Sequence, residues 1–456
     1  MSCCSPETSW SFPERDARRF PCDPIPLPIK TDKAFAMPRI PVALAFAAAV
    51  VAAAPAAALE WDLEPSIATR YDYNTNTRLL QSGHDSGWDV ALTPGFRATA
   101  QSASTAFTWT GGLSAVHNSV IDPRNRVDAN SGLAWRYSDE RSTWALNMNY
   151  VRDLTLASEL TTTGYLNQVV TRNAYTAAPS YTRALTERLS ATLGLTGNWS
   201  RYGHTGDNGL NDYDSYSAAP GLIYALSPRT SATFTLAGSY FRASPLDSTS
   251  QSDSASVGLS HQYSERLQVS ASVGYAHTRS HVASQLQCLL PTSAGLVQEP
   301  NEECEFASPP VTLTTVPGAD SSRNSPVYNL AVTWAATELT TLTASAAEAI
   351  VPSGLGATLD SRSYGLALAQ KLTERLSASL SGQLAASRFA GGTSLGSNSQ
   401  YRGLNANLNW KVTQQWSMDT GYRYAEVLFP GGSSSLHNNT VYAALRYDFT
   451  RMALSR

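Results

Sequence analysis

Residues that could act in catalysis are scattered along this chain. Asp85, Asp207 and Asp212 lie near histidines, but no spacing typical of a nucleophile and its base stands out. Gly-x-Ser-x-Gly occurs once, at 392–396, in a predicted loop between strands and not at a strand-to-helix turn, and there is no His-Glu-x-x-His, phosphate-binding loop or Cys/His cluster. We therefore predict no enzyme activity, no cofactor and no metal, and keep a surface lipid or peptide hydrolase as the least favoured alternative. Its base would come from the histidines in predicted loops or near strand ends: His84, His117, His204, His277, His281 and His437.

Two of the five cysteines are candidates for a disulfide. Cys288 and Cys304 lie in one polar segment, whereas the other three precede residue 37. Two cysteines in an exported protein most simply form a disulfide, so we predict the Cys288–Cys304 bond. Two unpaired thiols are the alternative.

Polar residues that could contact a solute alternate with apolar residues. Along residues 189–199, Leu193 and Leu195 share one parity, and Ser190, Thr192 and Asn198 share the other. Successive side chains of a strand point to opposite faces, so this pattern predicts a strand with one apolar face and one hydroxyl or amide face. The same period of two recurs at residues 255–263, 267–275, 404–411 and 416–424.

Short polar turns recur between these strands. Leu-Thr-Glu-Arg-Leu-Ser-Ala occurs at 185–191 and again at 372–378. Eight such turns imply sixteen strands, and strands near residues 61–74 and 440–449 bring the total to eighteen, with sixteen as the alternative. An even number places both termini on the side of the short turns. The turns lie at residues 101–104, 138–142, 186–188, 227–230, 264–266, 337–340, 373–375 and 413–415.

The N-terminal segment has the parts of an export signal. Residues 37–39 form a short basic region, residues 40–54 are apolar, and Ala56-Ala57-Ala58 offers a cleavage site. We therefore predict a signal peptide at 37–58, a non-native extension at 1–36, and a mature domain at 59–456. No later apolar run is long enough for a transmembrane helix, so a membrane-spanning chain must form a closed barrel.

The composition suits a wall that contacts lipid. Charged residues make up 15% of the chain, and the net charge is −3, without a basic patch. The low charge is unusual for a soluble domain, and the absence of a basic patch disfavours nucleic acid as a partner. Trp135, Trp144, Trp410 and Trp416 lie close to short turns on the apolar parity, as in aromatic girdles. We predict an all-β, antiparallel, up-and-down transmembrane barrel in the bacterial outer membrane, in contact with its lipid bilayer; a soluble β-sandwich is the alternative.

The inner face of such a barrel is expected to be rich in hydroxyl and amide groups, with few charges. A wall of this kind suits neutral or weakly charged sugars better than an ion-selective filter, although any water-filled lumen must be polar. Four of the charged residues lie on the last two strands and could form a cross-strand ladder. The predicted lumen-lining residues are Arg97, Arg136, Ser190, Thr192, Asn198, Asn405, Asn407, Asn409, Lys411, Asp419, Arg423, Arg446 and Asp448.

The last strand has an alternating apolar face. Val441, Leu445, Tyr447 and Phe449 share this face, which resembles the aromatic-ending signal recognised by the barrel-assembly machinery. The tail at 450–456 departs from that pattern, since many such barrels stop at the aromatic residue.

The chain also resembles the putative beta-barrel porin 2 group of outer-membrane proteins. The Leu-Thr-Glu-Arg-Leu-Ser turns, the stretch Tyr-Val-Arg-Asp-Leu-Thr-Leu-Ala-Ser-Glu-Leu at 150–160 and Tyr-Arg-Tyr at 422–424 carry the resemblance, which spans roughly 61–449. It implies a barrel of about eighteen strands that passes polysaccharide outward, as several members accompany exopolysaccharide gene clusters. Polysaccharide-export components are then expected partners.

Two function classes follow. The first is a passive conduit for saccharide, with the long extracellular loop at 282–324 folding over or into its mouth. The second is a plugged structural or docking barrel of the cell envelope.

Overall fold

The computed structural model describes residues 60–80, 85–121, 124–159, 169–203, 210–244, 247–283, 285–292, 295–299, 312–316, 318–389, 398–429 and 435–453. Within these ranges, only the backbone is considered for 157–158, 285–292, 295–299 and 312–316. The predicted signal peptide and extension lie outside the described residues.

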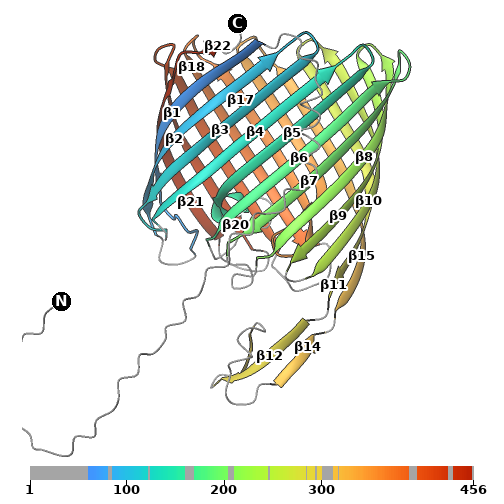
Figure 1. Cartoon of the computed structure of the whole chain (residues 1–456), viewed down its shortest axis with the longest axis vertical. Coiled ribbons are helices and arrows are strands. Elements are labelled where there is room, and N and C mark those ends of the chain that lie inside the picture. The colour runs from blue at the N-terminus through green and yellow to red at the C-terminus, as the bar shows by residue number, and fades with distance from the viewer. Residues whose placement is uncertain are drawn as a thin grey trace, which may run out of the picture. The chain divides into compact units, whose positions relative to one another are not determined.

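Eighteen antiparallel strands close into a barrel (Figure 1). Each barrel strand pairs with the next along the chain, and β21 pairs with β1 from Ser66 opposite Asp448 to Asn74 opposite Thr440. The predicted fold class and the count of eighteen are confirmed, and the alternative of sixteen is wrong. The strands are β1 (Glu60–Asn74), β2 (Gly87–Gln101), β3 (Thr105–Asn118), β4 (Asn125–Ser138), β5 (Ser142–Leu154), β6 (Thr171–Ala184), β7 (Leu189–Tyr202), β8 (Asp212–Ser227), β9 (Thr230–Ser244), β10 (Ser248–Ser264), β11 (Leu267–Val282), β15 (Ala319–Ala335), β16 (Thr340–Pro352), β17 (Thr358–Lys371), β18 (Leu376–Phe389), β19 (Ser399–Lys411), β20 (Trp416–Leu428) and β21 (Ser435–Asp448).

The repeated turn sequence has a local cause. In the turn between β6 and β7, the Thr186 hydroxyl accepts hydrogen bonds from the backbone N–H groups of Arg188 (3.3 Å) and Leu189 (3.0 Å). Thr373 makes the same two bonds between β17 and β18. A hydroxyl or carboxylate that accepts backbone N–H groups two and three residues ahead fixes a tight turn. Asp139 does so between β4 and β5, and the bonds from the N–H groups of Arg141 and Ser142 hold the pKa of its carboxyl below the usual value.

Three prolines each interrupt the hydrogen-bond ladder to one of their two neighbouring strands. Pro94 lies opposite Ile67 of β1, but the ladder between β2 and β3 breaks at Pro94 and resumes at Gly95. Pro179 and Pro220 break the ladder to the following strand in the same way, opposite a stretch that contains glycine. Because proline lacks an N–H, it removes a ladder bond to one neighbour and leaves the other ladder intact.

The segment predicted as one loop at 282–324 contains regular structure. β12 (Gln285–Thr292) pairs with β13 (Gly295–Glu299) and β14 (Thr312–Val316) in a separate three-stranded sheet. The predicted loop boundary at Asn324 is wrong, because β15 begins at Ala319 and pairs with β11 along its whole polar start. That start lacks apolar alternation, so periodicity could not show it. Of the predicted disulfide, Cys304 and the Cys288 side chain lie outside the described residues.

The C-terminal tail continues the closing seam. The Phe449 N–H donates to the Pro65 carbonyl (3.0 Å), and β22 (Met452–Ala453) pairs with Leu63 and Asp62 of β1. Arg451 forms an ion pair with Asp62. The tail therefore covers part of β1 that extends beyond the end of β21.

Removal of residues 450–456 is expected to weaken this seam. The loss of a few backbone hydrogen bonds costs about 1–3 kcal/mol. The temperature at which the folded barrel loses its compact gel mobility should fall, while Arg451→Gln, which keeps the backbone pairing, should lower it less. An unchanged transition temperature after truncation would show that the tail does not stabilise the seam.

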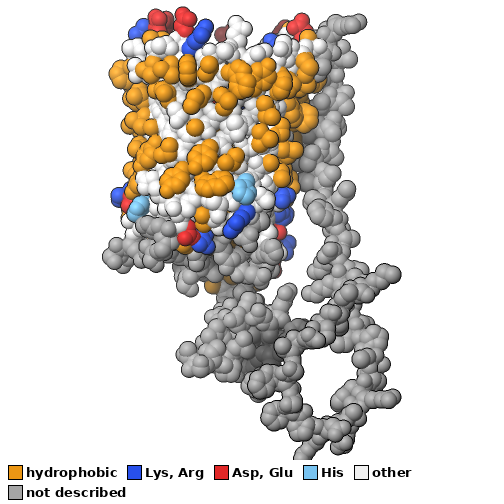
Figure 2. Space-filling model, turned by 90° about the vertical axis from the view of Figure 1, so that its left-hand side faces the viewer, with side chains coloured by type: hydrophobic (Ala, Val, Ile, Leu, Met, Phe, Trp, Pro, Cys, Tyr) orange, Lys and Arg blue, Asp and Glu red, His pale blue; other side chains and the backbone are white. Residues whose placement is uncertain are grey.

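The outer face of the barrel carries exposed apolar side chains, such as Leu193, Leu195, Val257 and Leu259. Figure 2 shows hydrophobic side chains over the outer surface, with charged side chains near its two ends. We call this parity of each strand the outer face and the opposite parity the inner face. Among the described residues, no helix is both long and apolar enough to cross a membrane.

Candidate functional site: the barrel lumen

The predicted lumen residues all fall on the inner face. Arg97 differs in parity from the outward-facing Leu92 on the same strand, β2. Its cross-strand partners are Glu64 of β1 and Thr110 of β3. Ser190, Thr192 and Asn198 alternate with the exposed Leu193 and Leu195 of β7. The same alternation places the rest of the set inward: Arg136 on β4, Asn405, Asn407, Asn409 and Lys411 on β19, Asp419 and Arg423 on β20, and Arg446 and Asp448 on β21. Their part in transport stays a prediction.

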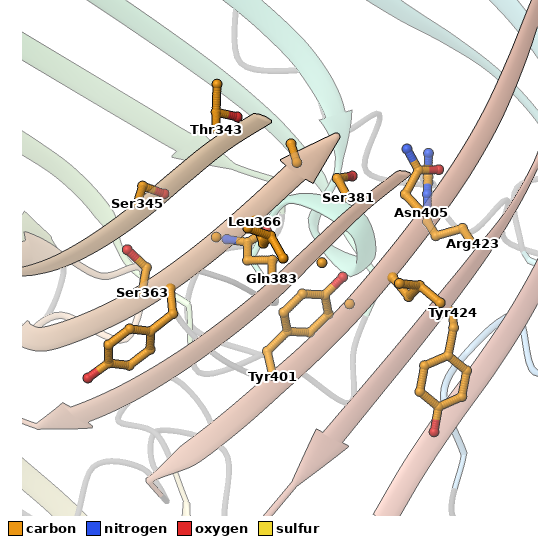
Figure 3. A pocket seen from close by; sticks show the side chains of 16 residues that line it. Thr343, Ser345, Ser363, Leu366, Ser381, Gln383, Tyr401, Asn405, Arg423 and Tyr424 are labelled. Carbon is orange, nitrogen blue, oxygen red and sulfur yellow. The ribbon is translucent and has the colours of Figure 1, made fainter. Parts of the chain in front are cut away.

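One sector of the inner wall holds a polar groove with a single charged lining residue. A cavity of about 410 Å³ lies against β16 to β20 and is lined by Ser345, Ser363, Ser381, Gln383 and Asn405. Figure 3 shows Gln383 and Tyr401 side by side on neighbouring strands, whereas the Tyr424 ring points away. Arg423, at the edge of the groove, is its one cationic lining residue. The groove offers hydroxyl and amide groups as donors and acceptors beside an aromatic ring.

The Tyr401 ring is held by its surroundings. A Cβ added to Gly403 would lie 2.7 Å from the Tyr401 hydroxyl oxygen, so the ring rests over a position where only hydrogen fits. The ring also packs against a buried apolar cluster of Leu79, Val427 and Leu436. Leu79 belongs to the β1–β2 connection and has a positive φ of 54°. This connection therefore packs against the inner wall and fixes one side of the groove.

A second sector of the inner wall is charged, contrary to the prediction of few lumen charges. Ion pairs join Arg70 to Asp72 (2.6 Å) on β1 and Arg126 to Asp128 (3.0 Å) on β4. Each pair is formed two residues apart on one strand, so its net charge is zero. The Arg70 guanidinium also lies 4.1 Å from the centre of the Tyr442 ring, a cation–π contact.

Asp419 of β20 does not form the predicted charge ladder with Arg446 and Asp448 of β21. Arg446 pairs with Asp448 on its own strand (2.7 Å). Asp419 accepts a hydrogen bond from the Asn409 amide (2.7 Å) instead of pairing with an arginine of β21. The reason is geometric: residues two apart on a strand share a face and lie close enough for Arg–Asp contact.

A short helix, α2 (Thr155–Ser158), is anchored to the inner face at the end with the longer connections. The carboxyl of Glu159, which follows α2 and is 1% exposed, accepts bonds from Arg172 Nη1 (3.0 Å) and the Tyr202 hydroxyl (2.8 Å). Arg172 also donates to Asp153 (3.1 Å). Tyr202 and Arg172 have inner parity on β7 and β6, so these bonds hold α2 against the lumen wall.

The connection between β16 and β17, residues 353–357, also folds inward. The Gly354 carbonyl accepts a hydrogen bond from the backbone N–H of Asn211 (2.6 Å), at the start of β8. A Cβ at Gly354 would lie 2.6 Å from the Tyr202 hydroxyl and 3.0 Å from Leu210 Cδ2. On its other side, the Ser248 hydroxyl donates to the Gly356 carbonyl. The connection thus bridges inner positions of β8 and β10 that are far from it in strand order.

Three further contacts fix this bridge. Asp360, just after it, pairs with Arg323 (3.0 Å) and accepts from the Ser325 hydroxyl (3.2 Å). The Thr358 and Ser250 hydroxyls lie 3.2 Å apart. Together with α2 and the β1–β2 connection, residues 353–357 narrow the lumen near one end. We call these three elements the constriction.

The candidate catalytic residues do not assemble into a hydrolase site within the described ranges. His277 bonds Asn324 (2.6 Å) and Arg279 (3.1 Å), and His281 bonds Asp320 (2.6 Å). His117 bonds Asn125 (2.7 Å). The residues described contain no group of three potential metal ligands. His84, His204 and Asp207 lie outside the described residues, while Asp212 caps the Tyr202 N–H (2.8 Å) and Asp85 pairs with Arg78.

The predicted assembly residues lie on the outer face of β21. Val441, Leu445 and Phe449 are exposed, and the Tyr447 ring lies 4.9 Å from both the Trp416 and Phe449 rings. The cluster belongs to the end of the barrel with short turns. Recognition by the assembly machinery stays a prediction.

One family model matches part of this chain. Residues 321–449 match the family model described as Putative beta-barrel porin 2. No curated protein matches the chain.

Several solved structures align over most of the chain at low identity. Pseudomonas aeruginosa OccK5 (OpdH) is 11% identical, with a TM-score of 0.41, 85% of this chain and 99% of that chain being covered. Pseudomonas aeruginosa OpdK with vanillate is 10% identical, with a TM-score of 0.41 and coverage of 86% and 99%. Acinetobacter baumannii OccAB3 is 9% identical, with a TM-score of 0.40 and coverage of 86% and 99%.

The predicted resemblance is confirmed by the match over residues 321–449, which covers the strands that line the polar groove. The chain is therefore a closed antiparallel β-barrel whose residues 321–449 match the Putative beta-barrel porin 2 family model.

Proposed function

We propose that the barrel passes neutral saccharides, through a lumen narrowed by the constriction. The observation that carries this proposal is the groove of Ser363, Ser381, Gln383 and Asn405 beside the Tyr401 ring. Sugars present hydroxyl groups that both donate and accept, and they present C–H faces that pack on aromatic rings. The groove has partners for both, and an eighteen-stranded barrel is wide enough to hold water and solute.

The neighbouring inner wall extends this polar track. The inner face of β10 carries Ser250, Ser252, Ser254 and Ser256 in succession. The Thr278 hydroxyl of β11 donates to Ser252 (3.0 Å), and the Ser280 hydroxyl donates to Ser250 (3.0 Å). Hydroxyl groups bonded to one another can exchange partners with a passing sugar without exposing an unpaired charge.

Exopolysaccharide is the larger substrate that we propose within this class. Its support is the sequence resemblance to a group whose members accompany exopolysaccharide genes, together with a wall whose charged sector is neutralised by Arg–Asp pairs. Polysaccharide-export components are then the proposed partners, beside the lipid bilayer and the barrel-assembly machinery.

Tyr401→Ala is expected to weaken binding of a neutral oligosaccharide in the groove. Loss of an aromatic contact of about 0.5–1.5 kcal/mol corresponds to a drop in affinity of roughly threefold to tenfold. The measurement is block of ion current by maltohexaose across a planar bilayer. The matched control is Tyr424→Ala, which removes the ring that points away from the groove; it should leave block unchanged. Equal block by wild type and Tyr401→Ala would contradict the role of the groove.

The constriction favours a second candidate, a structural or docking barrel that stays closed. The buried Glu159 anchor and the Asn211–Gly354 bond hold two elements inside the lumen. Conductance separates the candidates, because a closed barrel carries no current until the constriction is loosened.

A further inference from the structure

Four neighbouring strands form a polar patch on the outer face, at the end with the longer connections. The first row across β9, β10, β11 and β15 is Arg242, Thr249, His281 and Asp320. The second row is Tyr240, Gln251, Arg279 and Ser322. The register joins the members of each row directly, and these positions share the parity of the exposed apolar residues. The patch therefore faces away from the lumen.

The neighbouring rows of outer-face residues show where the patch lies along the barrel axis. Two rows further toward the short turns lie Leu236, Ala255, Tyr275 and Pro326. Phe234, Val257, Val273 and Tyr328 follow in the next row of that parity. The patch thus begins where an apolar band edged by Tyr240 and Tyr275 ends. Aromatic rings of this kind mark the boundary between acyl chains and headgroups, so the patch lies at the level of the headgroups.

The patch contains an open cavity of about 460 Å³, whose lining includes Thr249, Gln251, Arg279, His281 and one carboxylate, that of Asp320. Arg279 is positioned by a relay: its Nε donates to His277 Nε2 (3.1 Å), and His277 Nδ1 bonds the Asn324 carbonyl oxygen (2.6 Å). In this arrangement Nε2 accepts from Arg279 and Nδ1 donates to Asn324. These two hydrogen bonds hold one edge of the Arg279 guanidinium, and neither involves a carboxylate.

Other charged groups surround Arg279. His281 Nδ1 lies 2.6 Å from Asp320, and both side chains are exposed. Arg242 pairs with Asp247 (3.0 Å) in the β9–β10 turn. Asp253 accepts from Gln251 (3.4 Å). Each of these carboxylates bonds to a polar group other than Arg279. The Arg279 guanidinium is therefore available in this cavity to bind an external anion.

We propose that this cavity binds a phosphate group of a membrane glycolipid in the outer leaflet. The planar Arg279 guanidinium suits the bidentate recognition of phosphate oxygens, and Thr249, Gln251 and His281 supply further hydrogen-bonding groups around it. An arginine on a lipid-facing wall at headgroup level favours phosphorylated headgroups over neutral ones. The lipid would hold β9, β10, β11 and β15 at a fixed depth, independently of what passes through the lumen.

The test compares a bisphosphorylated disaccharide lipid with its dephosphorylated form on the purified full-length barrel in detergent, by native mass spectrometry. Arg279→Gln is expected to lower affinity for the phosphorylated lipid by about tenfold, the scale of one charge-assisted hydrogen-bond pair. The dephosphorylated lipid should bind wild type as weakly as it binds the variant.

The matched control is Arg402→Gln. Arg402 is also exposed on the outer face, near the same end of β19, but it is paired with Glu426 (3.7 Å). The Arg402→Gln substitution should leave binding of the phosphorylated lipid unchanged. Equal binding of the phosphorylated lipid by wild type and Arg279→Gln would overturn the proposal. So would an Arg279-dependent site that inorganic phosphate fills as well as the lipid does, since the site would then be one for free phosphate.

Discussion

A Gly354→Val variant is expected to conduct ions several-fold better than the wild-type barrel. Gly354 lies where a Cβ would be 2.6 Å from the Tyr202 hydroxyl and 3.0 Å from Leu210. Tyr202 cannot yield easily, because its hydroxyl donates to the buried Glu159. The added side chain must therefore push residues 353–357 away from β7 and β8 and break the Asn211–Gly354 bond. The measurement is single-channel conductance in planar bilayers.

The control for this variant is Gly382→Val. Gly382 lies within β18, and the nearest atom to an added Cβ is 3.9 Å away, an ordinary contact. It should conduct like wild type. If Gly354→Val folds, runs as a compact barrel and conducts no better than Gly382→Val, the bridge formed by residues 353–357 does not limit the pore.

Glu159→Ala should release α2 from the wall. The substitution removes bonds to Arg172 (3.0 Å) and Tyr202 (2.8 Å) from a site that is 1% exposed. Bonds to charged groups contribute about 1.5–3 kcal/mol each, so the local free energy of opening should fall by about 3–5 kcal/mol. Amide exchange at Thr155, whose N–H donates to the Val170 carbonyl (3.0 Å), should speed up accordingly, and the current should become larger and noisier.

Two further variants serve as comparisons for Glu159→Ala. Glu159→Gln keeps an acceptor for Tyr202 and loses only the charge, so its effect should be intermediate. Glu187→Ala, in the exposed turn before β7, should change neither exchange at Thr155 nor current. Unchanged exchange in Glu159→Ala would mean that Glu159 does not hold α2.

The strand pattern could be predicted from the sequence because it is local. Period-two alternation and a turn-fixing hydroxyl, as in Thr186 and Thr373, act within a few residues. Each strand pairs with its neighbour in the chain, so the turns alone fix the order of the strands. The inner face follows from the same alternation, which is why Asn405 and Arg423 were placed correctly.

The charged sector of the lumen had a sequence signal that parity alone did not reveal. Arg-x-Asp occurs at 70–72, 126–128 and 446–448, and each occurrence forms an ion pair on one strand. Residues two apart on a strand share a face, so the motif predicts self-neutralised charge and argues against a ladder between strands.

The constriction could not be predicted in this way. Gly354 and Asn211 are 143 residues apart, and their contact depends on where the closed wall places β8 and β17. Glu159 was part of the stretch that carries the family resemblance, but its partners Arg172 and Tyr202 become neighbours only when β6 and β7 pair. Inward folding of connections is a tertiary property without a local period.

The central claim, an open lumen selective for neutral saccharides, is tested most directly by the swelling of liposomes that contain the purified barrel. Neutral mono-, di- and trisaccharides should cause swelling at rates that fall with size. Cationic sugars of equal size should enter more slowly, because the groove is lined by Arg423 and by no carboxylate. Gly354→Val should raise the rates for the larger sugars. Liposomes that do not swell in any neutral sugar, with wild type or Gly354→Val, would contradict the account.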